Sequence, residues 1–176
     1  VPMGHIGPHR LQRQALIEFG TYCQFFSNDT QCLFCGIIAE KPLHHGHYQR
    51  YFTASPQEIA EVVEAAYAEG VASELQITGG VIPGRAEVSY ILEVGRAVRE
   101  RLGVETIPGS QAVLVPPPPA QIKELREAGW EGVAFNLEVW DPRLWRGVVP
   151  GKDALLSRDG WLEALEHAVR VFGKGN

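Results

Sequence analysis

Residues 75–102 read LQITGGVIPGRAEVSYILEVGRAVRERL, and they contain the clearest structural signal in the chain. The first four residues suit a short strand, which stops at Gly79-Gly80 because paired glycines favour a turn. From about residue 86 to 102, apolar side chains recur at helical spacing, as expected for one buried helix face. These side chains are Val88, Ile91, Leu92, Ala97, Val98 and Leu102. The stretch therefore predicts a strand followed by a helix, which is one βα unit.

The same order of strand and helix is predicted four times along the chain. The helix at 56–69 has the clearest start, because Ser55 suits the N-cap, Pro56 the first helical position and Glu58 a capping box. Four prolines at 116–119 predict a rigid turn before another helix. The predicted strands are 17–25, 75–78, a segment within 105–115 and 132–140, and the predicted helices are 56–69, 86–102, 119–128 and 157–172. Repeated βα units predict an α/β fold with a parallel sheet.

Parallel strands joined by right-handed crossovers form either a doubly wound sheet or part of a barrel, and periodicity alone does not choose between them. Residues 1–176 are interpreted as one domain, with 1–15 as an N-terminal extension. The sequence stops at Asn176, just after a predicted helix, where another strand would follow in such a fold. We therefore expect either a fragment of a larger barrel or a half-barrel that protects its open sheet edge by self-association.

Composition limits the classes of partner. The chain has 176 residues, 45% of them hydrophobic, which is enough for the core of one globular domain. Its formal net charge is -5, and its Lys and Arg residues are scattered, so no basic stripe suits nucleic acid. No apolar run approaches the roughly 20 residues that span a bilayer, and residues 1–10 lack the apolar core of a signal peptide. These features predict a cytoplasmic protein whose partners are small molecules or proteins, without nucleic acid or membrane.

All three cysteines of the chain lie close together. Cys23, Cys32 and Cys35 follow the pattern C-x8-C-x2-C. An odd, clustered set in a reducing compartment favours metal binding over disulfides. A four-iron cluster normally takes four cysteines, so three thiolates predict an iron–sulfur cluster with one iron open to an external ligand.

A zinc site is the alternative interpretation of these cysteines. His44, His45 and His47 follow closely, and one of them would complete a tetrahedral Cys3His site. On that interpretation the protein is a non-catalytic, zinc-stabilised βα domain that binds a partner. A third interpretation is that the thiols are merely adjacent and bind no metal, so that a half-barrel functions by assembly with another chain.

The cysteine segment resembles the cluster loop of the radical S-adenosylmethionine (radical SAM) superfamily. That family's usual pattern is C-x3-C-x2-C with an aromatic residue before the last cysteine, and Phe34 occupies the aromatic position here. The first spacing is eight residues in this chain instead of three. The resemblance implies a partial (βα) barrel of the radical SAM type, with about four of the usual six βα units present. It also implies a 4Fe-4S cluster bound by Cys23, Cys32 and Cys35.

A second match is Thr78-Gly79-Gly80 at the end of the predicted second strand. It is similar to the family's Gly-Gly motif, which binds the amino group of S-adenosylmethionine. Glycine lets the backbone approach a ligand closely because no Cβ intervenes. The resemblance implies that Gly79 and Gly80 are backbone contacts of this cofactor, and an ordinary strand-to-helix turn is the alternative. The family often continues with an acidic residue, whereas this chain has Val81.

A third match is the run FNLE at 135–138, which is similar to the fourth strand of lipoyl synthase and biotin synthase. By that resemblance, Asn136 and Glu138 contact the ribose or methionine part of S-adenosylmethionine. Alternation along a strand would put both side chains on the same face. The alternative is a pair of core polar residues that are hydrogen-bonded to neighbouring loops, since an unsatisfied buried polar group is costly.

Further candidates come from the neighbouring elements. Ser110 and Gln111 on the predicted third strand could face the same cavity. Phe34 is a further candidate contact of the cofactor. Lys152 or Arg158 could pair with the methionine carboxylate by charge attraction.

Taken together, the resemblance implies an enzyme that uses a 4Fe-4S cluster to cleave S-adenosylmethionine reductively. The resulting 5'-deoxyadenosyl radical would abstract hydrogen from a substrate, while the protein holds cofactor and substrate in register. The electron would come from a donor such as flavodoxin or ferredoxin. Similarity to lipoyl and biotin synthases points to sulfur insertion or a related reaction, but the sequence has no further cysteines for a second cluster. No side chain is assigned as a catalytic acid or base.

Overall fold

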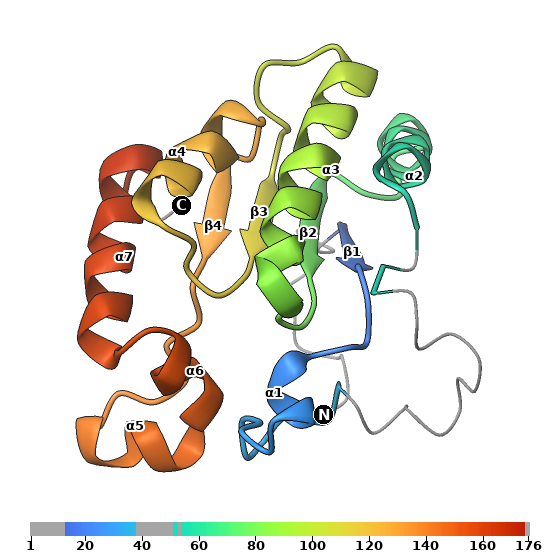
Figure 1. Ribbon diagram of the computed structural model, residues 1–176. Coiled ribbons are helices and arrows are strands. Elements are labelled where there is room, and N and C mark those ends of the chain that lie inside the picture. The colour runs from blue at the N-terminus through green and yellow to red at the C-terminus, as the bar shows by residue number, and fades with distance from the viewer. Residues whose placement is uncertain (1–12, 38–50, 53, 175–176) are drawn as a thin grey trace, which may run out of the picture.

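The computed structural model describes residues 13–37, 51–52 and 54–174. Its centre is a parallel sheet of four strands in the order β1-β2-β3-β4 (Figure 1). The strands are β1 (Gln14–Glu18), β2 (Glu74–Thr78), β3 (Ser110–Val113) and β4 (Gly132–Ala134). The helices are α1 (Gln24–Ser27), α2 (Pro56–Ala68), the 3-10 turn η2 (Pro83–Arg85), α3 (Ala86–Leu102), α4 (Pro119–Glu127), α5 (Pro142–Val148), α6 (Pro150–Leu155) and α7 (Arg158–Phe172). The predicted α/β fold with four parallel strands is confirmed.

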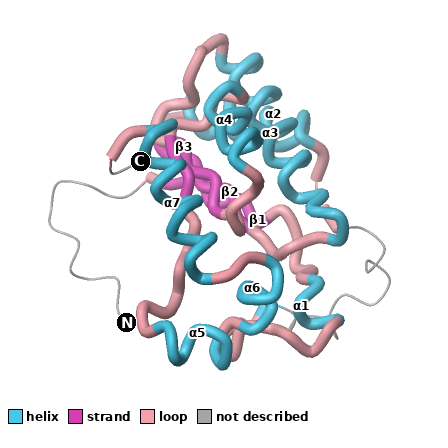
Figure 2. The backbone as a smooth tube through the Cα atoms, turned by 60° about the vertical axis from the view of Figure 1, so that its left-hand side comes forward, coloured by secondary structure: helices cyan, strands magenta, loops and turns pink. Residues whose placement is uncertain are grey.

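The long helices α2, α3, α4 and α7 lie on one side of the sheet (Figure 1). The short helices α1, α5 and α6 gather beyond the end to which the strand arrows point, which is the carboxyl edge of the sheet (Figures 1 and 2). A doubly wound sheet needs helices on both faces and a reversal of strand order. Within the described residues neither occurs, so the sheet has the winding of a partial barrel. This choice between two topologies is the one that periodicity could not make.

The sheet buries one face and leaves the other partly open. Ile77 of β2 is fully buried, and its neighbours in register are Ile17 of β1 and Ala112 of β3. Successive side chains of a strand point to opposite faces. On the face away from the long helices, Leu16 of the edge strand β1 is 61% exposed. The core therefore lies between the sheet and the long helices.

Several predicted elements have the predicted boundaries to within two residues. Helix α2 begins at the capping box, where the Ser55 hydroxyl accepts from the Glu58 backbone N–H and the Glu58 side chain accepts from the Ser55 backbone N–H. Strand β2, helices α3, α4 and α7, and a strand within 105–115 are likewise confirmed. None of the helices in the described part of the chain is long and apolar enough to cross a membrane.

The predicted first strand, 17–25, is wrong in its position. Strand β1 ends at Glu18, and the apolar residues that follow belong to a loop and to α1. Phe19 and Cys23 of that loop and Phe25 of α1 are buried, so the apolar run there reflects packing of the loop and the short helix and not sheet pairing. The residues of β1 itself are largely exposed because β1 is the edge of the sheet.

The predicted fourth strand, 132–140, is too long, because β4 ends at Ala134. Beyond that point the backbone carbonyls are bonded by side chains: Trp161 Nε1 donates to Phe135 O at 3.1 Å, and Lys152 Nζ donates to Asn136 O at 2.9 Å. The short helices α5 and α6 were not predicted. Asp141 accepts from the Arg143 N–H at the start of α5, so an Asp-Pro pair was an available signal for that helix.

Candidate functional site

A cavity of about 170 Å³ lies at the carboxyl edge of the sheet, where all four strands end. The residues that line it come from the loops after the strands and from α1, α3 and α6 and their neighbouring turns. They include the three cysteines, the glycine pair and two polar residues beyond β4. The chemically relevant members are Cys23, Cys32, Cys35, Phe34, Gly79, Gly80, Glu87, Asn136, Glu138 and Lys152. Three sequence motifs, the first and last of which lie about a hundred residues apart, therefore meet at one site.

The cysteine segment folds back on itself so that the three thiols face the same cavity. Cys23 immediately precedes α1, and Cys32 and Cys35 lie in a turn in which Cys35 N–H donates to Cys32 O at 3.0 Å. The segment is fixed to the glycine turn by the bond from Gln24 N–H to Val81 O, at 2.8 Å. Cys23 and Cys32 are buried, whereas Cys35 is half-buried.

Burial raises the pKa of both the Cys23 and the Cys32 thiol above the ordinary value. Backbone hydrogen bonds with Val81 and Phe25 act in the opposite direction on Cys23, and the ammonium of Lys152 does so on Cys32. The nearby thiol of Cys35 raises both pKa values further, so the three thiols lie close enough to interact electrostatically. Thiols that are buried and protonated must lose protons when a cation binds.

These thiols do not form a site for a single ion as they stand. Within residues 13–37, 51–52 and 54–174, no three His, Cys, Asp or Glu side chains are arranged to hold one metal ion. His44, His45 and His47, the predicted fourth ligands of a zinc site, lie outside the described residues.

Gly79 and Gly80 are required for packing of the loop after β2 against the cysteine segment. A Cβ on Gly79 would lie 2.5 Å from the ring of Phe19, and a Cβ on Gly80 would lie 2.6 Å from the Cβ of Cys23 and still closer to the carbonyl of Tyr22. Real Cβ contacts are not so short, so only glycine fits at either position. This close approach of the two loops brings the Gly-Gly backbone to the cavity beside the thiols.

Asn136 and Glu138 both line the cavity, but not because of strand alternation. They lie beyond the end of β4, and Glu138 has a left-handed backbone with φ of 66°. The carboxylate of Glu138 pairs with Lys152, whose Nζ lies 2.9 Å from Glu138 Oε1. Glu138 therefore lines the cavity, as the cofactor-contact prediction requires. It is also hydrogen-bonded to Lys152 of α6, as the alternative of a core polar residue requires.

Two other predicted residues have different positions. Phe34 lines the cavity with its ring 59% exposed. Ser110 does not reach it: this buried residue lies at the amino end of β3, where its Oγ accepts from the Glu131 N–H at 2.9 Å. Arg158 is also not part of the lining, because it packs over Trp140 and donates to its carbonyl at 2.9 Å.

Glu87 is a buried carboxylate of the cavity that the sequence did not indicate. It is 1% exposed, its Oε2 accepts from the Ile82 N–H at 2.9 Å, and its Oε1 pairs with Arg85 Nε at 2.5 Å. Arg85 in turn donates to Val115 O at 2.7 Å, beyond the end of β3. An acidic residue in the first turn of a helix is common, so the pattern gave no reason to single out Glu87.

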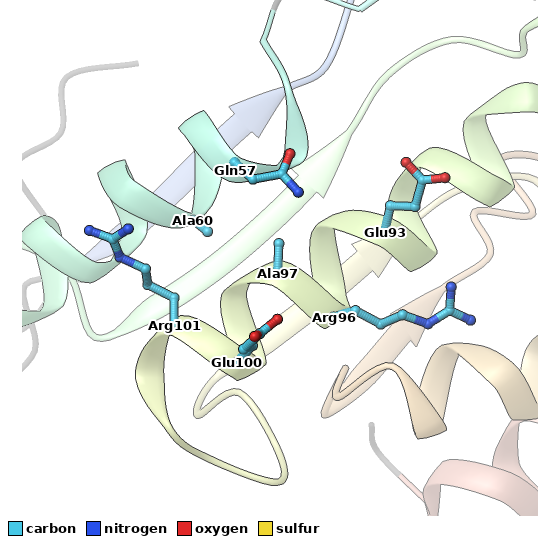
Figure 3. A pocket seen from close by; sticks show the side chains of 7 residues that line it. All are labelled: Gln57, Ala60, Glu93, Arg96, Ala97, Glu100 and Arg101. Atoms are coloured by element: carbon cyan, nitrogen blue, oxygen red, sulfur yellow. The ribbon is translucent and has the colours of Figure 1, made fainter.

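A larger hollow of about 480 Å³ lies between α2 and α3 (Figure 3). Its lining comes from these two helices alone and is rich in charged side chains, as Figure 3 shows. Arg101 at its rim pairs with Glu64 of α2 at 2.7 Å. No strand end, thiol or glycine turn contributes to it, so the smaller cavity at the carboxyl edge is the candidate site.

The sequence pattern of the radical SAM superfamily matches residues 17–174. Among curated proteins, bacteriochlorophyllide c C-7(1)-hydroxylase of Chlorobaculum limnaeum is 29% identical over 170 residues. That match covers 90% of this chain and 42% of the relative, so the chain spans less than half of the relative's length.

Solved structures share the fold. Methylornithine synthase (PylB) matches with a TM-score of 0.64 and 23% identity, over 89% of this chain and 41% of that protein. HydG, a maturase of the FeFe-hydrogenase, matches with a TM-score of 0.64 and 17% identity, over 90% of this chain and 32% of that protein. The family pattern covers nearly the whole chain and the fold agrees with it, and this protein therefore belongs to the radical SAM superfamily.

Proposed function

We propose that this chain is the core of a radical SAM enzyme that binds a 4Fe-4S cluster through Cys23, Cys32 and Cys35. The observation that carries the proposal is the meeting of these thiols with the Gly79-Gly80 turn in one cavity at the carboxyl edge of the sheet. Ligands of open α/β sheets bind at this edge, because the loops that shape a site converge there.

We favour a cluster over a single zinc ion because the radical SAM family pattern matches residues 17–174. A tetrahedral zinc ion with Zn–S bonds of about 2.3 Å needs sulfurs about 3.8 Å apart. In an iron–sulfur cluster each thiolate binds a different iron, so the sulfurs stand farther apart. Among the described residues, the three thiols line one cavity and influence one another's pKa.

When bound, the reduced cluster would supply the electron that splits the sulfonium of S-adenosylmethionine into methionine and a 5'-deoxyadenosyl radical, which abstracts hydrogen from a substrate. The chain's own residues position the cofactor. Gly79 and Gly80 offer backbone groups that no Cβ shields, and Asn136 and Glu138 offer polar contacts from the opposite side. The exposed ring of Phe34 offers an apolar surface at the cavity.

The substrate and the electron donor are part of the same proposal. The curated relative is named for hydroxylation at a carbon of bacteriochlorophyllide c, a reaction that must break a C–H bond. We propose hydrogen abstraction from a small-molecule or protein-bound substrate, with an electron donor such as flavodoxin or ferredoxin. Kinship to lipoyl and biotin synthases stays a prediction from residues 135–138.

The test uses the full-length protein, reconstituted anaerobically with iron and sulfide and reduced with dithionite. Visible absorption of an iron–sulfur cluster, about four irons per chain and formation of methionine and 5'-deoxyadenosine are expected. Cys32→Ala should abolish all three. The neighbouring substitution Leu33→Ala should not, because Leu33 is 72% exposed and its side chain is not part of the cavity lining. A colourless protein with one tightly bound zinc and no iron uptake would reject the proposal.

A further inference from the structure

Lys152 is a buried cation that joins the cavity to the segment beyond β4. It is 9% exposed, and its Nζ donates to Asn136 O and to Glu138 Oε1, each at 2.9 Å. The same ammonium lies 4.9 Å from the centre of the Trp161 ring. A buried ammonium is retained only where it is paired and hydrogen-bonded, and here both partners belong to the proposed cofactor site.

The residue before Lys152 is held to the other half of the site. Gly151 N–H donates to Thr30 O at 2.8 Å, within the cysteine segment. A Cβ on Gly151 would lie 2.5 Å from the ring of Phe25, so only glycine permits this contact. A further bond, from Leu33 N–H to Val148 O at 2.9 Å, fixes the cysteine segment to α5. One turn of α6 therefore touches the cysteine segment with one residue and the segment beyond β4 with the next.

The segment beyond β4 depends on such side-chain bonds for its position. This segment lies outside the sheet. Its Phe135 carbonyl accepts from Trp161, and its Asn136 carbonyl accepts from Lys152. Glu138 has a left-handed backbone, which residues with a Cβ adopt only where the surroundings hold them. Without the Lys152 ammonium, this segment would lose the two hydrogen bonds at Asn136 O and Glu138 Oε1 that help to fix its position.

We infer that Lys152 is a positioning residue. It holds the Asn136 peptide and the Glu138 carboxylate at a fixed distance from the cysteine segment, so that one S-adenosylmethionine contacts both parts of the site. Lys152 binds Oε1 of Glu138, and the carboxylate keeps Oε2 for a hydroxyl of the cofactor. The inference rests on the proposed function. It differs from the sequence-based expectation that Lys152 binds the methionine carboxylate directly.

The variants for a test are Lys152→Met, which keeps the stem but removes the charge and the donors, Glu138→Ala, and the double variant. The matched control is Lys123→Met, because Lys123 is 73% exposed on α4 and, among the described residues, pairs with Glu127 at 3.3 Å. Binding of labelled S-adenosylmethionine to the full-length protein with an oxidised cluster is measured by equilibrium dialysis, which avoids turnover. Iron content and circular dichroism report whether each variant is loaded and folded.

Lys152→Met should weaken S-adenosylmethionine binding about 10–100-fold, the usual loss when a residue that orients a ligand is removed, with iron content unchanged. Part of that loss should vanish in the Glu138→Ala background, because Lys152 acts through Glu138 as well as through the Asn136 carbonyl. Equal affinity of Lys152→Met and the unaltered protein would overturn the inference. An equal loss in both backgrounds would also overturn it, in favour of direct contact with the cofactor.

Hydrogen exchange of peptides covering 135–139 tests the positioning role without cofactor. In the cluster-free full-length protein, Lys152→Met should exchange faster there than the unaltered protein or Lys123→Met. Unchanged exchange would contradict the inference. If Lys152→Met does not fold, Lys152→Arg takes its place, and weaker binding is again expected because the fork of Arg does not reproduce the two bonds. If the unaltered protein takes up no iron and binds no S-adenosylmethionine, the proposed function fails, and with it the assignment of Lys152 to a cofactor.

Discussion

Gly80→Ala is the substitution that tests most directly whether the glycine turn and the cysteine segment form one site. A Cβ at residue 80 would lie 2.6 Å from the Cβ of Cys23, 2.9 Å from its Cα and nearer still to the carbonyl oxygen of Tyr22. Two of these atoms belong to the backbone, so no side-chain rotation relieves the collision. The loop after β2 and the cysteine segment must move apart.

The expected magnitude follows from the cost of overpacking. Inserting one methyl group into a well-packed site costs about 1–3 kcal/mol. For a chain of this size each kcal/mol lowers the melting temperature by about 2–4 °C, so Gly80→Ala should lower it by about 2–12 °C. Because the collision involves Cys23, the displaced thiol should also reduce the iron retained after anaerobic reconstitution.

Thermal unfolding followed by circular dichroism and an iron assay measure the two effects. Gly147→Ala is the control, since a Cβ there meets no heavy atom within 4 Å and the residue lies inside α5. Alanine is the better helix former, so this control should raise stability by about 0.5–1 kcal/mol and leave iron content unchanged. The reasoning would be refuted if Gly80→Ala had the same melting temperature as the unaltered protein and retained as much iron.

The remaining predictions concern the frame around the site. Glu87→Ala should lower the free energy of unfolding by about 3 kcal/mol in urea titrations, because it leaves Arg85 without its buried partner; a loss below about 1 kcal/mol would show that the pair is not important for the fold. Ser55→Ala should cost about 1 kcal/mol at neutral pH through loss of the helix cap. Hydrogen bonds from Ser55 lower the pKa of Glu58, so this contribution is present above the unfolded-state pKa and is lost as the pH falls through the folded one. The difference in stability between Ser55→Ala and the unaltered protein should therefore narrow as the pH falls below the ordinary Glu pKa, and a constant difference would count against the capping box. Burial raises the pKa of Tyr67 to about 12. The stabilising contribution of the neutral Tyr67 should therefore be constant below its unfolded-state pKa of about 10 and should fall as the pH rises toward 12. In Tyr67→Phe, this part of the alkaline loss of unfolding free energy should disappear in unfolding curves measured across that range.

The contacts at the carboxyl edge show how a short sheet supports a complex site. The four strands end within one region, and the loops after them carry the thiols, the glycines and the polar residues. Helices α5 and α6 lie at this edge. Beyond Ala134, where β4 ends, the side chains of Lys152 and Trp161 donate to backbone carbonyls that the sheet no longer pairs. The site is thus held together by both backbone and side-chain hydrogen bonds between loops, while the sheet sets only where the loops begin.

Local signals in the sequence determined most of the elements. The capping box at Ser55, the helical spacing through 86–102 and the glycine pair after Thr78 depend on a few neighbouring residues, and each has the expected form in the structure. The family also followed from short motifs whose order along the chain is specific. Such features can be recognised without knowing what lies against them.

Tertiary contacts decided what these signals left open. Whether the apolar run 19–25 is strand or loop depends on burial against other elements, and the end of β4 depends on Trp161 and Lys152, which lie some 16 to 26 residues away. The same holds for Ser110, which was predicted to face the cavity but lies at the amino end of its strand, where its Oγ accepts from the Glu131 N–H. The sequence by itself determined the βα units, their order along the chain and the family, because these follow from short local motifs. Only the tertiary structure decided that the helices cover one face, that Glu87 and Lys152 face the cavity, and that α6 ties its two halves together, because these depend on residues that are distant in the chain and close in space.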